Sequence, residues 1–286
     1  MIDLDDLRPR FAAVTAPGEH CDVVRGALAI ARIGHPDVTP EPTIARLDAL
    51  AAGVRPRLDA TAPVERRAAQ LAAYLFEECG YHGNRDDYYD PRNSFLNDVL
   101  ERQTGIPITL AVLLIAVGAR AGVPLEGVGF PGHFLVRVVG AERPVLLDPF
   151  FGGRAIDHAE LLERLRAFYG AGGGPAGSSP QRALAQALQT ASPLGILARM
   201  LGNLLAIYRD REAHEEALAT VELLLVLQPD QPDHVRTRGL LYEQLECFTS
   251  AVADFRRYLA LAPSSPDATR VREHLAQLEG VTGTLH

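Results

Sequence analysis

The C-terminal part of the chain repeats itself with a period of 34 residues. The same residue type recurs one period later at five places: Tyr208 and Tyr242, Ala217 and Ala251, Leu225 and Leu259, Pro229 and Pro263, and Asp233 and Asp267. Repeats of about this length are commonly helical hairpins, and such a hairpin buries its apolar face only by stacking on its neighbours. The period therefore predicts an all-α array in this part of the chain.

The second unit of the array resembles the tetratricopeptide repeat. Gly239, Tyr242, Ala251 and Phe255 stand where that motif places small, aromatic, small and large residues, and Pro263 closes the unit. An ordinary pair of helical hairpins with coincidental spacing is the alternative. The chain holds about two repeats and a final helix, whereas about three repeats are usually needed to bury a continuous core. We therefore expect the repeats to pack against the preceding domain.

Length and composition favour two domains. At 286 residues with 47% hydrophobic residues, the chain exceeds a typical single domain and can bury substantial cores. The stretch "GAGGGPAGSSPQ", residues 170–181, has the composition of a flexible linker. We expect a first domain over 1–169 and the repeat domain over 182–286.

Helical segments that end at glycines dominate the start of the first domain. The patterns "CDVVRGALAIARIG", "PTIARLDALAAG" and "PVERRAAQLAAYLFEECG" predict helices that end near Gly34, Gly53 and Gly80. A further helix is expected over about 93–104. An apolar one follows over 107–122, with proline suited to its first turn and glycine to its end.

The pattern changes after this apolar helix. The segments "PLEGVGF", "HFLVRVV" and "PVLLD" are short, rich in Val and Leu, and separated by Gly and Pro, which predicts a small antiparallel sheet. A helix with Asp157 and Glu160 in a capping-box arrangement follows. The expected fold is an α+β domain followed by an all-α repeat domain.

His133 and Asp148 are the candidate catalytic pair of the sheet. His133 begins one predicted strand and Asp148 ends the next, so a tight turn between the strands would bring them nearly opposite each other. Opposite residues on an antiparallel pair share a face, and a carboxylate there can orient an imidazole. The alternatives are a hydrogen-bonded histidine at a strand edge and an aspartate that ends a strand in a turn.

The order of these elements resembles the core of the transglutaminase-like, papain-related superfamily. More narrowly, "NSFLNDVLERQTGIPITLAV", "GVGFPGHFLVRV" and "LLDPFFGG", followed by tetratricopeptide repeats, resemble the bacterial SirB-type family of transglutaminase-like proteins over about 20–280. The resemblance implies a Cys-His-Asp triad in which His133 and Asp148 match the last two members. The cysteine's place falls at or beside Thr109, at the start of the apolar helix.

Thr109 has three interpretations. It can be a structural residue that hydrogen-bonds locally near a helix start. It can be a nucleophile that relies on His133 as base, although a β-branched secondary alcohol is sterically poor for attack. The third interpretation is that the helix starts elsewhere and the alignment is displaced. We expect a catalytically silent domain that works with the repeats as a protein-binding or regulatory unit. The alternative is a hydrolase or acyltransferase that uses Thr109, His133 and Asp148.

Four polar residues are candidates for holding a partner on the repeats. The resemblance implies that the first helix of each repeat lines a concave surface, and these helices would begin near 198 and 232. The groove side would then carry Arg199, Asn203, Arg209 and Arg236. Because guanidinium groups pair bidentately with carboxylates, we expect a protein or peptide partner carrying Asp, Glu or a free C-terminus. The alternative is that these arginines are solvated or bind the chain's own first domain.

Charge and cysteine content exclude several classes of function. The 28 basic residues are all arginine and are outnumbered by 36 acidic ones, which argues against a nucleic-acid or anionic-membrane partner. Cys21, Cys79 and Cys247 lie far apart, so neither disulfides nor a zinc site is expected, and we expect no cofactor. The N-terminus lacks the pattern of a signal peptide and no apolar run is long enough to span a bilayer, which predicts a cytoplasmic protein.

Overall fold

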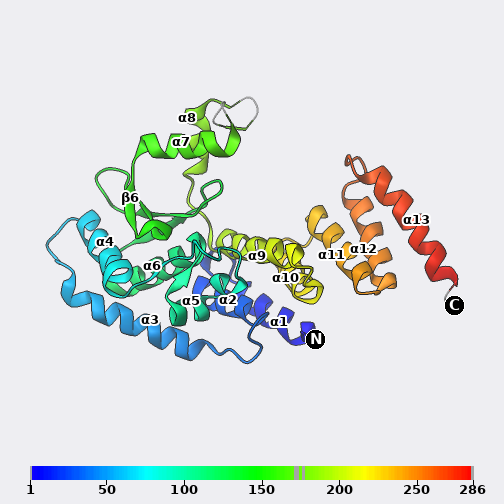
Figure 1. The fold of residues 1–286 in the computed structure, drawn as a ribbon, viewed down its shortest axis with the longest axis horizontal. Helices are drawn as coiled ribbons and strands as arrows, with labels where there is room; N and C mark the ends of the chain where they lie inside the picture. Colours follow the sequence, from blue (N-terminus) through cyan, green and yellow to red (C-terminus); the bar gives the residue numbers. More distant parts are fainter. Residues whose placement is uncertain (1, 171–173, 176–177, 285–286) are drawn as a thin grey trace.

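The computed structural model describes residues 2–170, 174–175 and 178–284. Figure 1 shows a body of helices that carries a small sheet, and an arm of helices that extends away from it. The helices of the body are Leu4–Thr15 (α1), Val23–Ala31 (α2), Pro40–Val54 (α3), Val64–Ala73 (α4), Leu96–Arg102 (α5), Pro107–Ala121 (α6), His158–Tyr169 (α7), Pro180–Ala187 (α8), Pro193–Asp210 (α9) and His214–Leu227 (α10). The arm consists of Pro232–Gln244 (α11), Phe248–Leu261 (α12) and Ala268–Thr284 (α13). The expected α+β region and the all-α region after it are both confirmed.

Helix α6 forms the centre of the first domain. Nearly all of its residues from Pro107 to Gly118 are buried, because its sequence is apolar on every side. It packs against α2, α3, α4 and α5, and strands of the sheet lie against it. Gly122 ends the helix with φ of +77°, a conformation that glycine adopts without strain. The predicted apolar helix is therefore confirmed.

Two features of the helical region differ from the prediction. The helix expected over 93–104 is a 3₁₀ turn, Pro91–Ser94, followed by the shorter α5. The Asn93 side chain explains this break, because its amide nitrogen donates to the carbonyls of Asp87 and Tyr88 at 2.7 and 3.2 Å and so fixes the preceding loop. Helix α1 is an addition to the predicted elements. Asp3 caps it, and a narrow apolar stripe that includes Phe11 is buried.

The sheet is an antiparallel meander of four strands in chain order: Leu125–Val128 (β3), Leu135–Val138 (β4), Leu146–Asp148 (β5) and Arg154–Ile156 (β6). The first three are the predicted Val- and Leu-rich segments. Strand β6 was not predicted, because it has three residues of which only Ile156 is buried, and this gives no periodic signal. A separate parallel pair joins His82–Gly83 (β1) to Thr104–Gly105 (β2).

Helix α7 begins as predicted at Asp157, whose carboxylate accepts a hydrogen bond from the Glu160 amide at 2.8 Å. The Glu160 carboxylate pairs with Arg154 and Arg164 instead of completing a capping box. Of the predicted linker over 170–181, residues 171–173 and 176–177 lie outside the described residues, and α8 begins within it at Pro180. The limits of the two domains stay a prediction.

The first repeat, α9 and α10, is part of the body. Helix α9 packs on α2 and α6, and α10 packs on α1. A single hydrophobic core runs from Phe11 in α1 to Leu201 in α9 and Leu224 in α10. The expected packing on the first domain is therefore confirmed for the first repeat. Most of the second repeat builds a separate core around Phe255 and Tyr258.

A buried ionic network joins the two repeats. The Arg238 guanidinium, on α11, donates two hydrogen bonds of 2.7 Å to the Asp254 carboxylate and bonds of 3.1 and 3.2 Å to Glu222 of α10. Burial lowers the pKa of Arg238, but the hydrogen bond and the two carboxylates outweigh it, so the pKa lies above its ordinary value. Arg8 of α1 also lies 3.3 Å from Glu222, which connects the start of the chain to the array.

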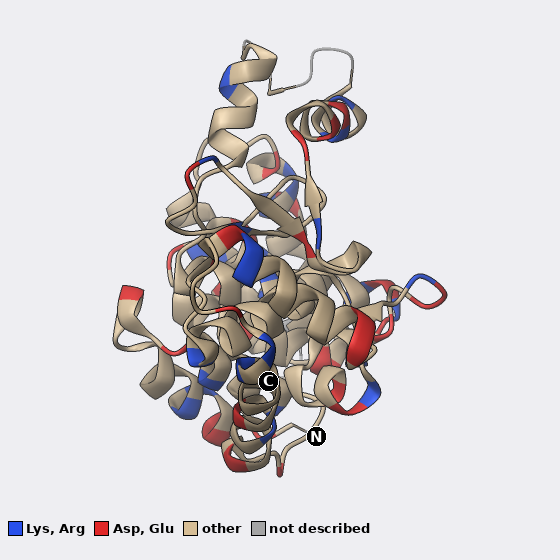
Figure 2. Cartoon of the chain, turned by 90° about the vertical axis from the view of Figure 1, so that its left-hand side faces the viewer, with Lys and Arg blue, Asp and Glu red and all other residues tan. Residues whose placement is uncertain are grey.

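Charged side chains are dispersed over the surface. Figure 2 shows arginines and acidic residues intermixed on the side turned to the viewer, without a face of one sign. Among the described residues, no helix combines the length and apolar character needed to cross a membrane.

Candidate functional site

The structure brings His133 and Asp148 together. Strands β4 and β5 pair Val136 with Leu147, and His133 lies in the bend just before β4 while Asp148 is the last residue of β5. The His133 Nε2 atom lies 2.8 Å from an Asp148 carboxylate oxygen. The Asp148 side chain is fully buried and His133 is 12% exposed, so the imidazole closes the carboxylate off from solvent.

The surroundings of Asp148 favour its ionised form. Its second oxygen lies 2.9 Å from Nη2 of Arg164, on α7. Burial by itself would raise the pKa of Asp148, but the hydrogen bond and charge of His133, with the charge of Arg164, hold the pKa below its ordinary value. An ionised Asp148 accepts the proton on His133 Nε2, which leaves Nδ1 as the free ring nitrogen of the neutral tautomer. Nδ1 has no hydrogen-bond partner among the described residues.

Aromatic rings surround this pair. Phe150 and Phe151, in the turn after β5, lie 6.1 and 6.0 Å from the His133 ring between centroids. Tyr88, from the loop before α5, lies 5.9 Å from Phe150. Arg85 stacks at 4.8 Å from the centre of the Phe151 ring. The only signals for these contacts in the sequence are the aromatic segments "DDYYD" and "DPFFGG", which lie far apart in the chain and therefore do not predict that their rings meet.

Two family patterns match this chain. The sequence pattern of the Transglutaminase-like superfamily matches residues 41–202, which is more than half of the chain. The chain belongs to the transglutaminase-like superfamily. A tetratricopeptide-repeat pattern matches residues 204–276 of this transglutaminase-like protein. The prediction of tetratricopeptide repeats from the 34-residue period is therefore confirmed.

Proteins of bacteria and of the mouse are similar to this chain. A UPF0162 protein of Xylella fastidiosa (strain Temecula1) is 41% identical over 232 residues, covering 81% of this chain and 80% of the relative. A UPF0162 protein of Vibrio cholerae is 32% identical over 228 residues, covering 79% and 81%. The mouse F-box only protein 21 is 32% identical over 183 residues, which are 60% of this chain and 27% of that protein. The resemblance to the SirB-type bacterial family is confirmed.

Thr109, which the resemblance puts at or beside the superfamily's cysteine, is fully buried. Its hydroxyl donates to the Asn93 carbonyl at 2.7 Å, lies 3.1 Å from the Ile106 carbonyl and accepts from the Ile106 amide at 3.1 Å. A hydroxyl has one proton, and here that proton has backbone acceptors. Among the described residues the structure does not join Thr109 to His133 by a hydrogen bond. These contacts are what a structural threonine at a helix start would make, and its role stays a prediction.

The predicted partner-binding residues lie in different surroundings. Arg199 and Asn203 are half-buried on α9, and Arg209 is exposed near the end of that helix. Arg199 Nη2 donates to the His133 carbonyl at 3.4 Å, so it faces the His133–Asp148 pair. Arg236 is on α11 and forms an ion pair with Asp267. The structure therefore does not gather the four around one cavity.

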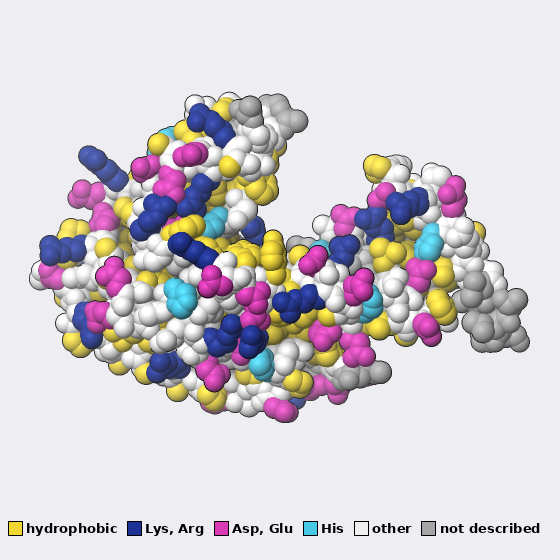
Figure 3. Space-filling model, in the orientation of Figure 1, with side chains coloured by type: hydrophobic (Ala, Val, Ile, Leu, Met, Phe, Trp, Pro, Cys, Tyr) yellow, Lys and Arg dark blue, Asp and Glu magenta, His cyan; other side chains and the backbone are white. Residues whose placement is uncertain are grey.

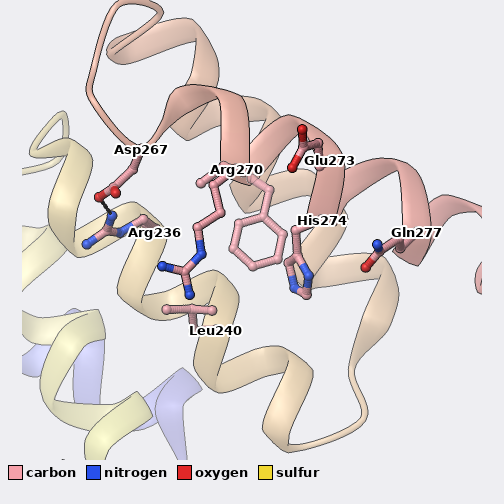
Figure 4. Close-up of a pocket in the computed structure, with 9 residues that line it drawn as sticks. Arg236, Leu240, Asp267, Arg270, Glu273, His274 and Gln277 are labelled. Carbon is pink, nitrogen blue, oxygen red and sulfur yellow. Dashed lines mark hydrogen bonds and ion pairs between the residues drawn. The ribbon is translucent and has the colours of Figure 1, made fainter.

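A groove of about 480 Å³ lies between α11 and α13. Arg236 and Arg270, one period apart in sequence, both line it, together with Leu240 and the Phe255 ring. Figure 4 shows Arg270 pointing from α13 toward Leu240, beside the pair formed by Arg236 and Asp267. Arg270 has no ion-pair partner among the described residues, and Leu240 is 42% exposed. Of the residues expected to line a groove of the repeats, this one contains Arg236 alone.

The described residues contain no cluster of three or more His, Cys, Asp or Glu side chains that could hold a metal ion.

Proposed function

We propose that this protein is a binding or regulatory scaffold in which the transglutaminase-like domain is catalytically silent and the repeats hold a protein partner. The observation that carries the proposal is the groove between α11 and α13, where Arg270 offers an unpaired guanidinium next to the exposed Leu240. An apolar contact and a charge-assisted hydrogen bond side by side fit a peptide segment with a carboxylate. We further propose that the protein works in the cytoplasm, as its acidic composition and three free cysteines suggest.

The surroundings of Thr109 support the silent domain. A nucleophile must reach its base and its substrate, and the Thr109 hydroxyl is fully buried with backbone partners for its proton. A secondary alcohol also lacks the low pKa that makes a thiol reactive near neutral pH.

Affinity capture from extracts of the source organism tests the scaffold. Wild-type protein should retain at least one partner that an Arg270→Glu variant loses. Arg256→Glu is the matched control, because Arg256 is an exposed arginine on α12 and does not line the groove. A folded Arg270→Glu variant that retains every partner would contradict the groove. Arg209→Glu, tested in parallel, reports whether the binding surface extends along α9.

A hydrolase or acyltransferase is the second candidate, because the His133–Asp148 hydrogen bond is the arrangement of a general base and its orienting carboxylate. In this mechanism Thr109 would attack an acyl group after a local shift, and His133 would take its proton. Turnover of an activated ester tests it. Thr109→Val and His133→Ala should both abolish turnover if the enzyme hypothesis is right, and equal rates in all variants would leave the scaffold.

A further inference from the structure

A half-buried arginine next to His133 has no carboxylate partner. Arg199 Nη2 donates one long hydrogen bond, 3.4 Å, to the His133 carbonyl, and no Asp or Glu of the described residues forms an ion pair with it. A carbonyl oxygen does not neutralise a guanidinium. Because a partly desolvated charge without a counter-charge is unfavourable, the site favours an anion from outside the chain.

Exposed aromatic rings lie around the same place. Figure 3 shows hydrophobic side chains and arginines lining the hollow between the α7–α8 region and α9. Of the large hydrophobic side chains exposed in the described part of the chain, all except Leu240 are aromatic, and they are Tyr88, Tyr89, Phe151, Phe168 and Tyr169. Exposed apolar patches of this kind mark binding surfaces.

Ring contacts connect the patch to the histidine. Tyr89 contacts Tyr88 at 5.2 Å between centroids, Tyr88 contacts Phe150 at 5.9 Å, and Phe150 contacts His133. On the other side, the Phe168 ring packs close to Gly132, the residue before His133: a Cβ atom placed on Gly132 would lie 3.1 Å from a ring atom of Phe168. The patch therefore borders His133 from two sides.

Three polar groups of these residues lack a strong partner among the described residues: the Arg199 guanidinium, the Tyr88 hydroxyl and Nδ1 of His133. Neither the Tyr88 hydroxyl nor His133 Nδ1 has a hydrogen-bond partner among the described residues. Burial and the neighbouring Tyr89 raise the pKa of Tyr88, while the charge of Arg199 acts in the opposite direction. A hydroxyl and a guanidinium both donate to a carboxylate.

We propose that Arg199, Tyr88 and His133 form a binding site for the C-terminal carboxylate of a polypeptide whose last residue is aromatic. Arg199 contacts the His133 carbonyl, and the His133 ring contacts Phe150 and Phe151, so a ligand that reaches both the cation and the rings must carry its carboxylate and its ring close together. A C-terminal aromatic residue does so within one residue. The site is separate from the groove between α11 and α13 and does not depend on the function proposed for it.

Binding of small fluorinated probes to the full-length protein, followed by ¹⁹F NMR line broadening, tests the site. The first probe is N-acetyl-4-fluorophenylalanine, the second is its carboxamide, and the third is N-acetyl-aspartyl-4-fluorophenylalanine amide, whose only carboxylate is in a side chain. The first probe should bind about tenfold more tightly than the other two, as expected for a charge-assisted hydrogen bond. Arg199→Gln should reduce its affinity to that of the carboxamide.

Arg211→Gln is the matched control, because Arg211 is exposed at the end of the same helix and should leave the affinities unchanged. If Arg199→Gln alters the fold, Tyr88→Phe at an exposed position provides a second variant, with an expected loss of about threefold to tenfold for the first probe. Equal binding of the carboxylate and the carboxamide, or no binding of either, would overturn the site. A preference that survives both variants would also overturn it, and tighter binding of the aspartyl probe would overturn the assignment to a C-terminus.

Discussion

Removal of Arg238 tests how strongly the buried network holds the repeats together. Arg238→Met keeps much of the side-chain volume and removes the cation that contacts both Asp254 and Glu222. Glu222 keeps the Tyr242 hydroxyl at 3.0 Å and the half-exposed Arg8. Asp254 has no other ion pair among the described residues. The substitution therefore leaves one buried carboxylate poorly paired and the other unpaired.

The expected loss is large for a single substitution. The Arg238 side chain is 15% exposed, and those of Glu222 and Asp254 are 2% and 6% exposed. The cost of breaking a buried ion pair therefore applies to this network. Breaking such a pair by removing one partner costs about 3–5 kcal/mol, against a total stability of about 5–15 kcal/mol for a typical domain. Arg256 provides the control, since its pair with Glu279 is largely exposed and is expected to contribute about 0–1 kcal/mol.

Urea unfolding followed by circular dichroism measures the free energy of unfolding of the wild type, Arg238→Met and Arg256→Met. Hydrogen exchange locates the loss, and amides of α10, α11 and α12 should lose protection first in Arg238→Met. A loss below about 1 kcal/mol, or one equal to that of Arg256→Met, would refute the reasoning, because it would place the network in the range of exposed ion pairs.

Three further predictions concern the Thr109 hydroxyl, the Asp148 carboxylate and the isolated repeat fragment. Thr109→Val should lower the free energy of unfolding by about 1–3 kcal/mol in urea titrations, because it removes a hydroxyl that bonds buried backbone groups, and an unchanged value would contradict the structural role. The pKa of Asp148 is lower in the folded protein than in the unfolded chain, so its contribution is fully present above about pH 3.9 and is lost as the pH falls through the folded pKa. The free energy of unfolding, measured in urea at several pH values, should therefore fall more steeply below about pH 4 in the wild type than in Asp148→Asn. Parallel curves for the two proteins would argue against a stabilising ionised Asp148. A fragment over 182–286 should be poorly folded by circular dichroism, because α9 shares its core with α2 and α6, and a cooperative transition like that of the whole chain would show that the repeats fold alone.

Several elements could be predicted from local pattern. The apolar helix α6 follows from a run of buried residues between a proline and a glycine, and the 34-residue period predicts the helical hairpins from recurring small and large residues. The pairing of His133 with Asp148 follows from strand alternation together with the family resemblance. These features depend on residues close in sequence or on a regular spacing.

Other features required the tertiary structure, because they depend on segments that no spacing relates. Arg199 belongs by sequence to the first repeat helix, but α9 packs into the first domain and directs this side chain to His133. By sequence the Thr109 hydroxyl had a nucleophilic role as an alternative to the expected structural one. Its bond to the Asn93 carbonyl arises only because the turn before α5 folds against the start of α6. The sequence by itself determined most of the helices, the first three strands of the antiparallel sheet and the family. Tertiary packing decided which polar groups are satisfied inside the protein and which, like Arg270 and Arg199, have no ion-pair partner among the described residues, because burial and pairing depend on distances across the fold.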